Sequence, residues 1–195
     1  MFLRVTALLS LFAIIFSMSG IARADTSEAL LNAQSDALKG IVTGLVPTLT
    51  RDEAGHFIAM YKNYTMYSMV KAVSADVENA IDKCSGNNKS MAEDLQGRFK
   101  QWDDTIGGMM KESLANINNM AISQSYISQA KLKTMFSLID EVRAVNSSRF
   151  ETAPVTTPEA CEFMMSKMDE TEGSMGSFLR QSLSSYPNLL KATQQ

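Results

Sequence analysis

Few residues of this 195-residue chain are suited to redox, metal or nucleophilic chemistry. The chain contains two cysteines, Cys84 and Cys161, one histidine, His56, and fourteen methionines. It has no C-x-x-C, H-E-x-x-H or G-x-S-x-G motif, and one histidine cannot supply the paired Glu-x-x-His ligands of a ferritin-like di-iron bundle. We therefore expect a protein that is not an enzyme and that has no catalytic residue and no cofactor.

His56 falls in the first turn of a predicted helix, where we expect it to be exposed. A b-type haem held by His56 and Met120 at one end of a helical bundle is a weaker alternative, because an exposed histidine is a poor axial ligand. We expect His56 to be dispensable for folding and function.

Methionines cluster most densely at Met164, Met165 and Met168. Thioethers bind Cu(I), so these three side chains are the candidate ligands if the protein carries copper. Methionine also fills gaps in helical cores, and most methionines here lie on apolar helix faces. We favour packing, and a periplasmic copper or haem carrier is the alternative function.

Neighbouring acidic residues occur at Asp103-Asp104, Asp140-Glu141 and Asp169-Glu170-x-Glu172. Adjacent carboxylates on a helix usually form a solvated face. A glycosidase or divalent-metal site would need them to meet in a cleft, which no spacing here indicates.

The first 24 residues have the pattern of a secretory signal peptide. Arg4 precedes the apolar segment from Val5 to Met18, which is too short to span a bilayer, and Ala22-Arg23-Ala24 is a small-x-small cleavage pattern. We expect a bacterial protein in the periplasm or the medium, with residues 25–195 as a single domain.

The charge of the chain argues against nucleic acid as a partner. The net charge is −3, and the predicted signal peptide removes two arginines and no acid. No later segment is apolar enough to span a membrane. We expect a protein partner that the sequence does not identify, and an oligomeric state that it does not define.

One long helix is predicted from Thr50 to Cys84. Thr50 and Glu53 form a capping-box pattern at its start. Helical spacing places the apolar side chains of its first half on a different side from Val70, Val73, Val77 and Ile81, so the two halves should face different neighbours.

An aromatic face occupies the first half of this helix, formed by Phe57, Tyr61, Tyr64 and Tyr67. Aromatic side chains usually serve as packing in helices. The alternative is a partner surface, covered by a weak first helix over residues 26–46. Gly40 and Gly44 each cost such a helix about 1 kcal/mol relative to alanine, so it could detach.

Further helices follow the same periodic pattern. Ser90 and Glu93 predict a second capping box, and a polar window near Ile122 to Ser125 predicts a turn before a helix to about Ser148. Thr157 and Pro158 begin a last helix that Pro187 should stop or kink.

No strand pattern occurs, so the sequence predicts an all-α fold, an up-down four-helix bundle with an additional N-terminal helix. In that topology Cys84, at the end of one helix, and Cys161, at the start of another, lie at the same end of the bundle. We therefore predict a disulfide between them, because export leads to an oxidising compartment.

We expect from these features a non-catalytic exported bundle that acts through protein–protein contacts, as an accessory, chaperone-like or inhibitory factor.

Overall fold

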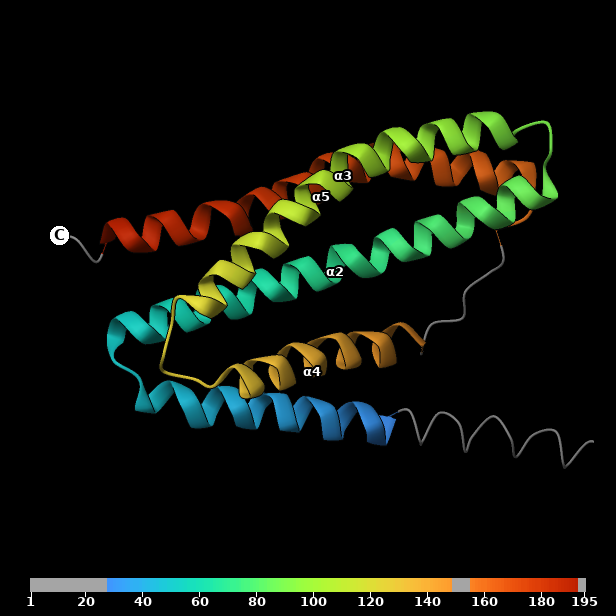
Figure 1. Cartoon of the computed structure of the whole chain (residues 1–195). Helices are drawn as coiled ribbons and strands as arrows, with labels where there is room; N and C mark the ends of the chain where they lie inside the picture. Colours follow the sequence, from blue (N-terminus) through green and yellow to red (C-terminus); the bar gives the residue numbers. More distant parts are fainter. Residues whose placement is uncertain (1–27, 149–154, 193–195) are drawn as a thin grey trace, which may run out of the picture.

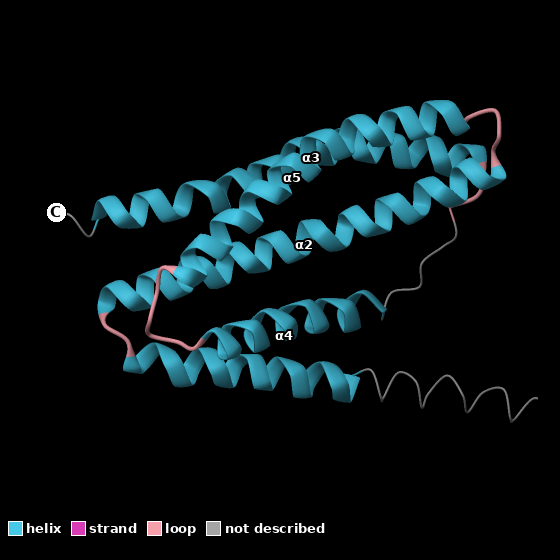
Figure 2. Ribbon diagram, viewed as in Figure 1, coloured by secondary structure: helices cyan, strands magenta, loops and turns pink. Residues whose placement is uncertain are grey.

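The computed structural model describes residues 28–148 and 155–192, apart from the side chains of 148 and 185–192. All regular elements within these ranges are helices (Figure 2). The chain forms an all-α helical bundle with an extra N-terminal helix and a disulfide between Cys84 and Cys161, as predicted. The predicted signal peptide lies outside the described residues.

Four long helices follow a shorter N-terminal part. The helix over 28–45 leads through a 3-10 turn, η1 (Val46–Thr48), into α2 (Arg51–Asn87), followed by α3 (Ala92–Ile122), α4 (Gln129–Ser148) and α5 (Pro158–Ala192). Successive helices reverse direction, so that α2 and α4 run parallel to each other and antiparallel to α3 and α5 (Figure 1).

The start of α2 is fixed by the predicted capping box. The Thr50 backbone N–H donates to Glu53 Oε2 at 2.9 Å, and the Glu53 N–H donates to Thr50 Oγ1 at 3.4 Å. These hydrogen bonds satisfy amides that have no partner within the helix. The pKa of the Glu53 carboxyl is lowered by the hydrogen bonds that it accepts from the backbone N–H and the hydroxyl of Thr50.

The two apolar faces of α2 enter two separate core clusters, as predicted. Phe57 and Met60 belong to the first cluster, with the end of α3, α4 and the N-terminal helix. Val70, Ile81 and Cys84 belong to the second, with the first half of α3 and with α5. The bundle therefore consists of a three-helix unit of α2, α3 and α5, with α4 and the N-terminal helix packed on the first half of α2 (Figure 1).

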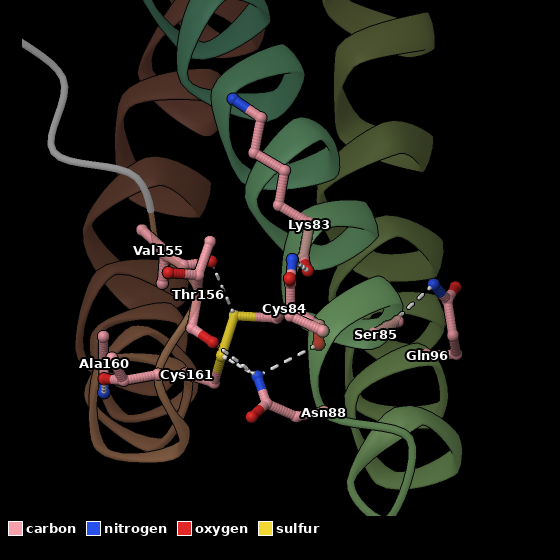
Figure 3. The surroundings of a disulfide bond; sticks show 11 residues. Lys83, Cys84, Ser85, Asn88, Gln96, Val155, Thr156, Ala160 and Cys161 are labelled. Carbon is pink, nitrogen blue, oxygen red and sulfur yellow. Dashed lines mark hydrogen bonds between the residues drawn. A yellow bond between two sulfur atoms is a disulfide. The ribbon is translucent and has the colours of Figure 1, made fainter.

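The disulfide joins the end of α2 to the start of α5 (Figure 3). The two Cα atoms lie 5.9 Å apart across a sequence separation of 77 residues, and both cysteines are fully buried. Asn88 Nδ2 donates to the carbonyl oxygens of Thr156 at 3.0 Å and Cys84 at 3.2 Å, which ties the segment before α5 to the end of α2.

Two further features hold α5 against α3. Arg98 on α3 forms ion pairs with Asp169 at 2.5 Å and with Glu172 at 2.8 Å on α5. At the buried Gly176, α5 lies against Met109 of α3, since a Cβ atom there would be 3.4 Å from the Met109 sulfur, an ordinary van der Waals distance.

One sequence prediction about helix ends was wrong. α3 begins at Ala92 with Met91 as its N-cap and has no side-chain cap hydrogen bond, so Ser90 and Glu93 form no capping box. α5 continues past Pro187 to Ala192, so the proline does not stop the helix, and the kink that was the alternative stays a prediction. At the other predicted start, the Ala160 N–H donates to Thr157 Oγ1 at 3.3 Å, so Thr157 caps α5 as expected.

Candidate functional site

An open groove of about 370 Å³ lies between α2 and α4. Its small lining residues are Ala72, Ala75, Ala144 and Ser147. Its polar lining residues are Ser68, Lys71, Asp76, Asp140 and Arg143. The groove therefore combines space beside two helix backbones with charged side chains along its edges.

The groove arises where a well-packed contact between parallel helices gives way to small residues. Tyr64 on α2 stacks on Phe136 on α4, with ring centroids 3.9 Å apart. One turn further along each helix, Ser68 donates to Asp140. After another turn Ala72 and Ala144 line the groove, and their methyl groups cannot fill the space that the two rings fill at the stacked pair.

Asp140 is the centre of a hydrogen-bonded cluster at the base of the groove. Its Oδ1 accepts from Ser68 Oγ at 2.6 Å, and its Oδ2 accepts from Tyr64 OH and from Lys71 Nζ, both at 3.1 Å. All three donors come from α2. The cluster therefore fixes the register of α4 on α2 and satisfies the carboxylate.

This cluster changes the acidity of two of its members. Burial raises the pKa of Asp140, but the hydrogen bonds from Ser68 and Lys71 lower this pKa by more than burial raises it. The net shift is downward, so the group is ionised at neutral pH. Burial and the negative charge of Asp140 raise the pKa of Tyr64, so its hydroxyl stays protonated and donates.

Arg143 is the groove residue with a buried polar atom that lacks a partner among the described residues. Its Nη2 donates to the carbonyl oxygen of Thr65 at 3.4 Å, near the limit for a hydrogen bond. Its Nε is out of contact with solvent and has no hydrogen-bond partner in the described part of the chain. No sequence pattern marked Arg143, because its position depends on the register of two helices distant in sequence.

The predicted aromatic face borders this groove but is largely packed. Phe57 is fully buried, and Tyr61, Tyr64 and Tyr67 are half-buried. They pack in the first core cluster together with Leu38, Ile41 and Val42 of the N-terminal helix. The N-terminal helix and the tyrosines thus share one cluster, while detachment of that helix stays a hypothesis.

The predicted methionine cluster lies in the second core cluster. Met168 is buried, and Met164 and Met165 are partly buried against this cluster. Their described contacts are those of packing residues. Binding of Cu(I) at these positions stays the alternative prediction.

We expected His56 to be exposed, and the structure shows that it is not. It is half-buried, and its Nδ1 lies 2.6 Å from the hydroxyl of Tyr126, in the segment between α3 and α4. Burial lowers the pKa of His56. The position of His56 in the first turn of α2 suggested exposure, but the connection between α3 and α4 folds over this turn. Met120, its suggested haem partner, is fully buried and accepts from Asn63 Nδ2 at 3.6 Å.

The acidic clusters take part in separate contacts. Asp169 and Glu172 pair with Arg98, Asp104 pairs with Lys100, and Asp140 belongs to the groove. Across residues 28–148 and 155–192 no three His, Cys, Asp or Glu side chains are grouped so that they could hold a metal ion.

A buried polar layer that the sequence did not indicate joins the three helices of the central unit. Asn63 Nδ2 and Asn116 Nδ2 donate to the carbonyl oxygen of Ser182 at 3.0 and 3.1 Å. Ser182 Oγ also lies 2.9 Å from Ser113 Oγ. Asn63, Ser113 and Ser182 are buried, so these hydrogen bonds specify the register of α2, α3 and α5.

Within the described residues, no helix combines the length and the apolarity that crossing a membrane requires. No protein-family model, no curated protein and no solved structure matches the chain.

Proposed function

We propose that the protein is an exported, non-catalytic accessory factor that binds a partner protein at the groove between α2 and α4. The observation that supports this most directly is the groove itself, where small residues leave two helix surfaces accessible beside charged side chains. Such a surface suits contact with a protein segment better than covalent chemistry.

The arrangement of polar groups supports binding over catalysis. Asp140 is ionised and already accepts three hydrogen bonds, so it is a poor general base. His56 contacts Tyr126 and is not among the residues that line the groove. The Ser68 hydroxyl that donates to Asp140 is buried, so it is not an accessible nucleophile.

A photocrosslinking residue tests this proposal in the exported protein. Ala144 lines the groove and is exposed. Asn146 is exposed on the same helix and, at about 100° per residue, points roughly 160° away from Ala144. A crosslinker at position 144 should give a discrete adduct in cells, and one at position 146 should not.

A second variant checks that the adduct depends on the groove. Ala72→Trp fills the groove from α2 and should abolish the adduct at position 144 without loss of helicity. Equal adducts at positions 144 and 146 would contradict the proposal. So would one equivalent of copper, or a Soret band, in the purified protein, because either result favours the carrier function.

A further inference from the structure

Arg143 has more hydrogen-bond donors than the described structure satisfies. A guanidinium carries five N–H donors and no acceptor. In the described part of the chain Arg143 donates to the Thr65 carbonyl, and its Nε is enclosed without a partner. Arg143 lines the groove, so an acceptor that enters the groove would be favoured at the remaining donors of this side chain.

The two carboxylates of the groove do not supply that acceptor. Asp140 lies one turn before Arg143 on α4, but its oxygens are taken by Ser68, Tyr64 and Lys71 of α2. Asp76 lines the same groove, yet neither carboxylate is within 4.0 Å of the guanidinium. Arg143 therefore retains its charge and donors for a group that enters from outside.

We infer that the groove accepts an acidic side chain from a segment of the partner protein, with the carboxylate bound by Arg143. This inference rests on the proposed function and names the chemistry of the segment. A carboxylate matches the planar fork of a guanidinium and forms two parallel hydrogen bonds with it. Residues flanking the acid would lie against Ala72, Ala75 and Ala144.

The shape of the groove favours a protein segment over a free small acid. Pockets for small ligands bury most of the ligand surface, whereas this groove is open along two parallel helices. An open surface supplies too few contacts to hold an isolated acid, and a segment gains contacts on both sides of its acidic residue.

The charge of Asp76 leads to a second prediction for the same site. It is exposed and lies in the wall of the groove, so it repels a negatively charged segment. Asp76→Asn should strengthen binding of an acidic peptide by about twofold to threefold at low ionic strength. A purely structural role of Arg143 gives no reason for that gain.

The test uses the full disulfide-bonded protein labelled with ¹⁵N, in which the Arg143 Nε–H resonance is assigned by its loss in Arg143→Lys. The probes are the blocked peptide Ala-Ala-Glu-Ala-Ala and its Gln counterpart. The Glu peptide should shift the Arg143 resonance saturably, and the Gln peptide should shift it by less than about a tenth as much. Arg51→Lys, on the exposed first turn of α2, is the matched control and should bind normally.

Three results with the peptides would overturn the inference. They are the absence of a saturable shift, equal shifts with both peptides, and unchanged binding by Arg143→Lys as followed by the backbone amides of Ala72 and Ala144. Acetate that matched the affinity of the Glu peptide would also overturn it, in favour of a free-acid site. If crosslinking at position 144 succeeds and the peptides fail, the proposed function stands and this inference falls.

Discussion

Tyr64 lies flat on Phe136, with an interplanar angle of 11° and 3.9 Å between ring centroids, and its hydroxyl donates to Asp140 at 3.1 Å. One side chain of α2 thus joins the aromatic packing of α4 to the charged base of the groove. Both interactions depend on the parallel register of these helices.

Phe136→Ala should reduce the free energy of unfolding by about 2 kcal/mol, because it removes a half-buried ring from the first core cluster. Tyr64→Phe keeps the stack and loses one hydrogen bond, so it should cost about 1 kcal/mol. Urea denaturation followed by circular dichroism measures both. If Tyr64→Phe costs more than Phe136→Ala, the hydroxyl matters more than the stack.

Asp140→Asn should destabilise the protein at neutral pH and have no effect in acid. The folded-state pKa of Asp140 is lowered, so its contribution is complete above the unfolded pKa of about 3.9 and disappears as the pH falls through the lower folded value. Denaturation midpoints from pH 7 to pH 2 measure this. A stability difference from the wild type that persisted at pH 2 would show that Asp140 acts by packing alone.

His56 should make the stability of the protein depend on pH in the neutral range. Burial lowers its folded-state pKa below the unfolded value of about 6.5, so stability falls as the pH drops from about 7 toward the lowered folded value. Tyr126 contacts this ring, and Glu53 lies close enough to Tyr126 to raise the pKa of its hydroxyl. His56→Gln should remove the fall, as read from thermal midpoints at pH 7.5, 6.5 and 5.5, while Tyr126→Phe should retain most of it.

Replacing both cysteines by serine should lower the free energy of unfolding by about 2–4 kcal/mol, because the bond restricts a long loop in the unfolded chain. Intact mass after alkylation, with and without reductant, verifies the bond in the purified protein. Two alkylated thiols in the unreduced sample would contradict the assigned disulfide.

Hydrogen exchange tests whether the N-terminal helix can detach from the tyrosines. A methyl group added at Gly40 or Gly44 would meet no neighbouring atom of the described residues within 4 Å, so these glycines contribute no close packing. Amides of Leu38 to Leu45 should exchange faster than those of Val70 to Ile81. Equal protection of the two segments would show that the helix is a permanent part of the core, and the aromatic face would then be packing.

Features encoded by neighbouring residues were predictable from the sequence. The capping box of Thr50 and Glu53 is local, and the two faces of α2 follow from helical spacing. The disulfide followed from the order of the helices, since Cys84 and Cys161 end and begin helices at one end of the bundle.

Features that depend on how helices meet were not predictable. Ser90 and Glu93 have the right spacing for a cap, but the turn after α2 places Met91 at the N-cap. Asn63 looks like a surface residue, and only the approach of Ser182 from α5 gives its amide an acceptor. Arg143 and the groove likewise arise from the register of α4 on α2.

The bond between Cys84 and Cys161 turns the chain between them, which includes α3 and α4, into a covalent ring. A protease that cuts the exposed connection between these helices, for example at Ser125, would leave a molecule of unchanged mass apart from one added water. The two pieces would separate on a gel only after reduction. Because the chain has two cysteines, a single intramolecular pairing exists, and oxidation alone completes the ring without any need for disulfide isomerisation.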